Sequence, residues 1–187
     1  VLFSSFKDNA EIYKRPFMLP ITWRFENYKM AWINAKISSN FFNSIIVSFS
    51  AVAIILVVAA MASYILARIS PSPALYTYFI IGIMIPIHAM LIPTFILMRG
   101  IGLFNTRLSL IIIYFVSNLA MSIFILVGFM KGIPKEMEES ASIDGCSMTM
   151  TFFKIIFPLS KPGLATIGTL AFLNCWNDFI FAFILIT

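Results

Sequence analysis

Charged side chains are scarce in this sequence, and their scarcity narrows the class of protein. Only 11% of the 187 residues are Asp, Glu, Lys or Arg, whereas a soluble domain of ordinary composition carries about 25%. The mean hydropathy is correspondingly high, at +0.96. So few charges could scarcely cover a water-soluble surface of this size. The composition therefore favours lipid as the solvent, and no nucleic-acid partner is expected.

The sequence also lacks the residue patterns of several catalytic and cofactor sites. It contains no Gly-x4-Gly-Lys-Ser/Thr phosphate loop, so we expect no ATP hydrolysis by this chain. The two cysteines, Cys146 and Cys175, do not have the spacing of metal ligands and are expected to be free thiols. No Ser/His/Asp or paired-carboxylate arrangement is present to suggest catalysis. We therefore expect a chain that is not an enzyme and holds no cofactor or metal.

Four long apolar stretches make up most of the chain. They cover residues 41–67, 73–98, 108–130 and 163–187, and their only charged or histidine side chains are His88 and Asp178. A helix needs about 20 apolar residues to cross a hydrocarbon core of about 30 Å. Helices also satisfy every backbone hydrogen bond in lipid. The sequence therefore predicts an all-α polytopic membrane protein with about four complete spans.

The ends of the sequence have the character of positions inside a longer chain. Residues 1–6 resemble the end of an earlier apolar span, and the fourth stretch reaches Thr187 without a charged flank. We expect residues 1–187 to be a fragment of a single transmembrane domain, with the first span truncated and the final span missing. Residues 7–40 form a polar, aromatic-rich leader, which is typical of a membrane interface.

The basic residues leave the orientation in the membrane open. The connectors 68–73 and 131–162 lie on one side and carry five basic residues, against two in the connector 99–107. This excess favours a cytoplasmic position for 131–162. The leader, however, adds six basic residues to the opposite side. Charge alone therefore does not decide which side is cytoplasmic.

The connector 131–162 is the longest and holds four of the eight acidic residues. Residues 133–145 predict a short helix, because Pro134 suits a first turn and the glutamates that follow suit the positive end of a helix dipole. Gly145 is placed to end this helix in a left-handed conformation. A second helical stretch, 147–157, is predicted to be stopped by Pro158 and Pro162. A solvated linker would explain the loop, and so would a rigid projection that enters a groove on a partner.

The same residues resemble the EAA loop of ABC importer permeases. That signature has Glu-Ala-Ala, two variable positions, Asp-Gly, nine variable positions and Ile-x-Leu-Pro. Ser140 replaces the first Ala and Phe157 replaces the Leu, and both changes are mild. The six positions that stand at the family spacing are Glu139, Ala141, Asp144, Gly145, Ile155 and Pro158.

Other segments are similar to the carbohydrate branch of this family, represented by the second membrane subunit of the maltose importer. The resemblance covers essentially the whole chain. The segments that carry it are 5–7 with 26–28, 43–44, 62–68, 102–106 and 176–179.

The resemblance implies a helical bundle like that of type I ABC importer permeases, in the bacterial cytoplasmic membrane and with the loop 131–162 in the cytoplasm. It implies that ATP and Mg bind a dimer of separate ATPase subunits, and that the loop helix docks into a cleft on an ATPase. The spans would then move a carbohydrate by alternating access. An extracytoplasmic solute-binding protein and a second permease subunit, expected to be a different chain, would complete the importer. Glu139 and Gly145 are expected to carry the docking.

Polar side chains inside the predicted spans are candidates for the substrate path. Small polar residues also hold helices together, and Asp178 has the further alternative of lying near the outer interface. His88 lies in a helix that its flanking prolines should kink. An ion path through Asp178 and His88 would favour an ion-coupled secondary transporter or channel, the alternative function. The candidate path residues are Asn118, Ser122, Asn174, Asn177 and Asp178.

Overall fold

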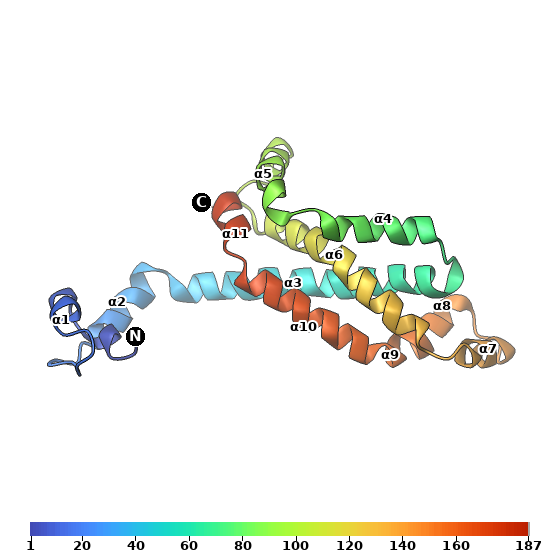
Figure 1. Ribbon diagram of the computed structural model, residues 1–187, viewed down its shortest axis with the longest axis horizontal. Helices are drawn as coiled ribbons and strands as arrows, with labels where there is room; N and C mark the ends of the chain where they lie inside the picture. The colour runs from blue at the N-terminus through green and yellow to red at the C-terminus, as the bar shows by residue number, and fades with distance from the viewer. Residues whose placement is uncertain (187) are drawn as a thin grey trace. The chain divides into compact units, whose positions relative to one another are not determined.

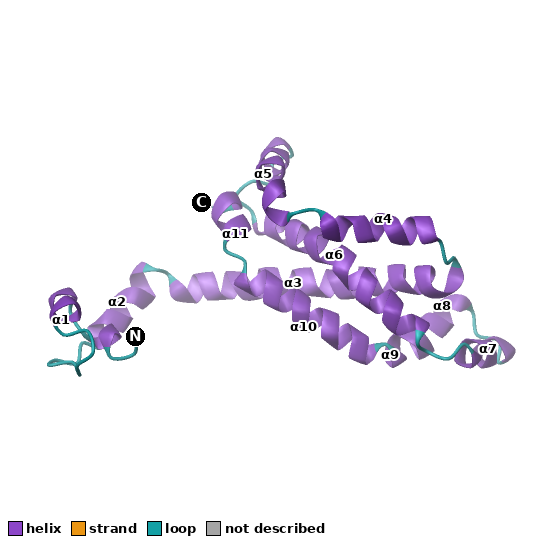
Figure 2. Ribbon diagram, viewed as in Figure 1, coloured by secondary structure: helices purple, strands orange, loops and turns teal. Residues whose placement is uncertain are grey.

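The computed structural model describes residues 1–186, and the part it describes contains helices and no strands (Figures 1 and 2). This confirms the predicted all-α class. The chain divides into two compact units, Val1–Ser44 and a second unit that begins at Ile45. The boundary falls inside the long helix α3 (Ile37–Tyr64).

The first unit is built around aromatic side chains. The ring of Phe6 packs against the rings of Trp23 and Tyr28, each at a centroid distance of 5.1 Å. Asp8 caps the helix that follows it, because its side chain accepts a hydrogen bond of 2.7 Å from the backbone of Glu11. The helical elements of this unit are η1 (Ser4–Phe6), α1 (Asn9–Lys14) and α2 (Glu26–Asn34).

The second unit is a bundle in which α6 (Arg107–Lys131) contacts the helices on either side. It packs against α4 (Pro73–Met84) and α10 (Lys161–Asn177). It also contacts η2 (Ile65–Ile69), a π-helical turn that continues α3. Figure 1 shows α10 on one side of α6 and α4 on the other. The shorter helices α5 (Leu91–Gly100) and α11 (Ile180–Leu185) pack against each other.

Two continuous helical segments of the described residues are long and apolar enough to cross a membrane. They are Ile37–Ile69, with 33 residues, and Arg107–Lys131, with 25 residues. Two further pairs of helices qualify only if each bent pair counts as one span: Pro73–Met84 with Ile87–Gly100, and Met148–Leu159 with Lys161–Asn177. The sequence predicted about four spans, and the structure divides two of the apolar stretches.

The stretch 73–98 bends sharply at Pro86. Helix α4 ends at Met84, and Ile85 adopts an extended conformation with ψ of 118°. Proline disfavours a helical conformation in the residue before it, which accounts for the break. The chain resumes as the 3-10 turn η3 (Ile87–Met90) and α5, and the two halves lie at 87°. The predicted kink is thus confirmed, and it is large.

The stretch 163–187 is interrupted at Asp178. Helix α10 ends at Asn177, and Asp178 is extended, with φ of −69° and ψ of 127°. Its Oδ2 accepts hydrogen bonds from the backbone N–H groups of Phe181, at 3.1 Å, and Ala182, at 3.3 Å. These bonds cap the first turn of α11. One acidic residue thus starts a new helix where the sequence alone suggested a single apolar span.

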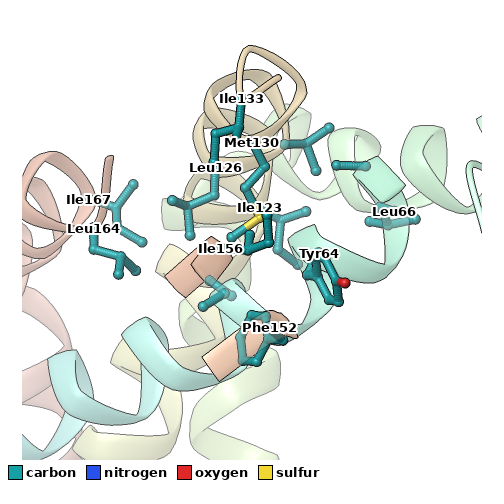
Figure 3. Packing of buried hydrophobic residues seen from close by; sticks show 14 residues of the cluster. Tyr64, Leu66, Ile123, Leu126, Met130, Ile133, Phe152, Ile156, Leu164 and Ile167 are labelled. Carbon is teal, nitrogen blue, oxygen red and sulfur yellow. The ribbon is translucent and has the colours of Figure 1, made fainter. Parts of the chain in front are cut away.

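The main core cluster lies where α3, α6 and α10 approach one another (Figure 3). Small residues on α3, Ala59 and Ala60, are fully buried and allow the neighbouring helices to come close. A second cluster includes residues of α3, α5, α6 and α11. The largest fully buried side chains of the main cluster are Ile123, Leu126, Met130, Ile156 and Ile167.

Candidate functional site

The first candidate site is the short helix α7 (Glu136–Ile143) with the corner that follows it. Its first turn carries three glutamates, where the helix dipole favours negative charge. Gly145 has φ of +79°, which confirms the predicted left-handed end. The N–H of Cys146 then donates to the carbonyl of Ala141 at 2.9 Å and closes the corner. A side chain at Gly145 would strain the backbone even though the space around it is open.

The six signature residues divide into an exposed group and a packed group. Glu139 is exposed in the first turn of α7, and Asp144 and Gly145 are exposed just past its last residue. Ala141 is buried, and Ile155 and Pro158 are half-buried, with Ile155 packed against the main core cluster. The structure therefore leaves three signature residues at the surface and covers the other three at least in part, with Ile155 packed against the bundle core.

The second helical stretch runs further than the sequence predicted. It consists of α8 (Met148–Thr151), the π-helical turn η4 (Phe152–Ile156) and α9 (Phe157–Leu159). The predicted stop at Pro158 was wrong, because the helical run passes through Pro158 directly after the π-helical turn η4 and reaches Leu159. The run ends before Pro162, the second proline that was predicted to stop it. The break comes at Ser160, and α10 leaves at 71°.

Arg68 makes contacts that the sequence did not reveal. Its Nε lies 3.2 Å from Oε1 of Glu138 on α7. The two atoms are not aligned as a hydrogen bond, so the contact is an ion pair. The Nη2 of Arg68 also donates to the carbonyl of Met130, at 2.6 Å, and to that of Ile133. One side chain therefore joins the end of the first long helical segment to the end of α6 and to α7.

The second candidate site is a group of polar side chains within the bundle. The Tyr114 hydroxyl donates to Oδ2 of Asp178 at 2.9 Å. The Nδ2 of Asn174 donates to Oδ1 of Asn118 at 3.0 Å, and Asn118 in turn donates to the Tyr114 carbonyl at 2.8 Å. These bonds join α6 to α10 and to the break that follows it.

A cavity of about 350 Å³ opens beside these polar groups. Asn118, Asn174, Asn177 and Asp178 line it, so four of the five predicted path residues come together. Ser122 does not line it, because its hydroxyl is buried and donates to the Asn118 carbonyl at 2.8 Å. Tyr114 and Ser117 also line the cavity and were not predicted from the sequence, although both lie one helical turn or less from Asn118.

His88 and the two cysteines are the remaining residues that the sequence singled out. His88 is exposed in η3 and does not line the cavity. Cys146 and Cys175 are free thiols. Within residues 1–186, no group of three or more His, Cys, Asp or Glu side chains is arranged to hold a metal ion.

Comparison with known proteins identifies close relatives among transport proteins. The profile of the family described as "Binding-protein-dependent transport system inner membrane component" matches residues 57–187. The chain is 39% identical over 182 residues to the diacetylchitobiose uptake system permease protein NgcG of Streptomyces coelicolor, covering 96% of this chain and 60% of that protein. It is 35% identical over 192 residues to the sulfoquinovosyl glycerol transport system permease protein SmoH of Agrobacterium fabrum, covering 97% and 65%.

A solved structure with a similar fold comes from a bacterial ABC transporter involved in the import of the acidic polysaccharide alginate. It superimposes with a TM-score of 0.85 at 25% identity, over 100% of this chain and 66% of that chain. The present chain thus spans about 60% of the length of NgcG and about two thirds of the lengths of the other two proteins.

Proposed function

Since the chain belongs to the family of binding-protein-dependent transport system inner membrane components, we propose that it forms part of a permease subunit that imports a carbohydrate. The permease works by alternating access in the bacterial cytoplasmic membrane. Separate ATPase subunits bind ATP and Mg and supply the energy. A solute-binding protein outside the membrane delivers the carbohydrate, and a second permease subunit completes the pathway. NgcG and SmoH support the substrate class, because NgcG is named for the uptake of diacetylchitobiose and SmoH for the transport of sulfoquinovosyl glycerol, and both compounds are sugar derivatives.

The observation that carries this proposal is the corner formed by α7 and Gly145. Glu139 is exposed in the first turn of a short helix, and Asp144 and Gly145 are exposed just past its last residue. Glu138 of the same helix faces Arg68 of the bundle. A helix presented in this way suits insertion into a groove on a partner. The loop 131–162 is therefore the proposed cytoplasmic docking site for an ATPase.

The cavity beside Asn118, Asn174, Asn177 and Asp178 is the proposed contact with the substrate. Amide and carboxylate groups offer the donors and acceptors that sugar hydroxyls need. Asp178 is already engaged, because its Oδ2 accepts from Tyr114 and from two backbone N–H groups. These bonds support a structural role for Asp178, and they weigh against the alternative of an ion-coupled transporter with Asp178 in its ion path.

The test is co-purification of the full-length permease with its ATPase from membranes, comparing wild type with Gly145→Trp. The matched control is Gly102→Trp, because Gly102 is exposed, has a left-handed φ of +73° and has open space around it, but lies in the other connector. We expect Gly145→Trp to lose the ATPase and Gly102→Trp to keep it. Normal membrane insertion of a wild-type protein that binds no ATPase would contradict the proposal.

A further inference from the structure

The contacts of Arg68 connect three parts of the bundle at a single guanidinium group. Arg68 belongs to η2, which continues α3. Its Nη2 reaches the Met130 carbonyl in the last turn of α6 and the Ile133 carbonyl just beyond it, and its Nε faces Glu138 in the first turn of α7. The side chains of Met130 and Ile133 belong to the main core cluster (Figure 3), so the residues that supply these carbonyls are anchored by packing.

The position of Arg68 makes these contacts stronger than those of a surface ion pair. Its side chain is only 4% exposed, and that of Glu138 is 23% exposed. Electrostatic interactions strengthen when water is excluded, and removing one partner leaves the other charge buried and unpaired. The carbonyls at the end of α6 also carry the negative end of a helix dipole, which favours a cation at this place.

The chemistry of arginine suits this position better than that of lysine. A guanidinium group presents several N–H donors in a fixed plane, so it can hold two carbonyls and a carboxylate at once. Lysine would offer the same charge at a single point. A role limited to charge balance would therefore be met by lysine, whereas a role in fixing the geometry of three elements would not.

We propose that Arg68 is a positioning residue that ties α7 to the ends of α3 and α6, so that movement imposed on α7 reaches both long helices together. This inference rests on the proposed function, in which α7 receives its movement from the ATPase. Glu138 is then the one glutamate of α7 that faces inward to the bundle, while Glu139 faces the partner. A bound ATPase would move α7, and the Arg68 contacts would transmit the displacement to α3 and to α6, and α6 lines the cavity through Tyr114, Ser117 and Asn118.

The experiment measures substrate transported per ATP hydrolysed by the full-length permease, assembled with its partners in proteoliposomes. The variants are Glu138→Gln, Arg68→Met and the double variant, with Glu136→Gln as the matched control, because Glu136 is exposed on the same helix. We expect each single variant to lower the ratio roughly fivefold, within the range seen for residues that carry coupling. The double variant should be no worse than Arg68→Met, because both changes break one connection.

The amount of ATPase that co-purifies separates this inference from the proposed function. The inference predicts that Glu138→Gln and Arg68→Met retain the ATPase and lose coupling. If both variants transport as well per ATP as Glu136→Gln while Gly145→Trp still loses the ATPase, the inference is wrong and the proposed function stands. If wild type binds no ATPase, the proposed function fails.

A second measurement tests the tie without an ATPase and without transport. Cys146 is bonded to the end of α7 through its N–H and is half-buried, so its reaction with a maleimide reports on how firmly α7 is held. Glu138→Gln and Arg68→Lys should both raise the labelling rate roughly fivefold over wild type, with Cys146→Ser giving the background. Arg68→Lys keeps the charge and serves if Arg68→Met fails to accumulate. Labelling at the wild-type rate in both variants would overturn the inference.

Discussion

The hydroxyl of Tyr114 donates a hydrogen bond of 2.9 Å to Oδ2 of Asp178, and this bond links α6 to the point at which α10 ends. The same carboxylate oxygen accepts from the backbone of Phe181 and Ala182. A single acidic side chain thus ends one helix, begins another and attaches both to a third. The arrangement explains how an ionisable group is accommodated among apolar side chains, where an unpaired one would be costly.

Tyr114→Phe should destabilise the bundle by about 1 kcal/mol, because it removes the hydroxyl from Asp178 and leaves the ring in place. Unfolding of the full-length protein in detergent measures the change. Tyr78→Phe provides the control, because Tyr78 is 71% exposed on α4, and it should leave the unfolding midpoint unchanged. Equal midpoints for the two variants would show that the bond contributes nothing measurable.

Gly163→Ala should destabilise the contact between α10 and α6 by about 1–3 kcal/mol, the usual cost of overpacking. A Cβ at this position would lie 2.9 Å from Cγ of Phe129 and 3.2 Å from Cδ2 of Leu126. Gly168→Ala, on the same helix, would meet Leu56 at an ordinary 3.5 Å and should be neutral or slightly stabilising. Thermal unfolding of both variants provides the comparison, and a more severe effect at Gly168 would contradict the packing described here.

Asn177→Ala and Asn118→Ala should separate substrate contact from structural support. Asn177 lines the cavity, and its side chain makes no hydrogen bond with any of the described residues. Asn118, by contrast, is hydrogen-bonded to Asn174 and to the Tyr114 carbonyl. We expect Asn177→Ala to raise the KM for uptake by about tenfold, which corresponds to about 1.4 kcal/mol of binding free energy. The stability of the protein should not change. Asn118→Ala should raise the KM and also lower stability. Uptake and unfolding are measured on the same preparations. An unchanged KM in both variants would show that the cavity is not on the substrate path.

Local features of the fold could be predicted from the sequence, and long-range contacts could not. The helix end at Gly145 and the bend at Pro86 depend on backbone preferences of a few neighbouring residues, so spacing and residue type were sufficient. The ion pair between Arg68 and Glu138 joins residues 70 positions apart, and no periodicity indicates which of several glutamates faces inward. Asp178 lay between these cases: its polarity marked it as unusual, but its capping bonds depend on how the chain turns after α10.

The residues that line the cavity also divide into features that the sequence indicates and contacts that only the fold determines. Asn118 was a candidate because a polar side chain in an apolar stretch is unusual, and the structure places it beside Asn174 from another helix. Ser122 had the same sequence signal but bonds its own helix backbone, which small hydroxyl side chains commonly do. Residue type and spacing identify such candidates, and tertiary packing decides which of them face a common space.

The most direct test of the account is a photo-crosslink from α7 to the ATPase in intact membranes. A photoreactive amino acid placed at Glu139, which is exposed on α7, would be compared with the same group at Arg99, which is exposed at the end of α5. We expect a crosslink to the ATPase from position 139 and none from position 99. A crosslink from position 99 alone, or from neither position in a permease that still transports its substrate, would contradict the claim that the loop 131–162 couples this protein to ATP hydrolysis.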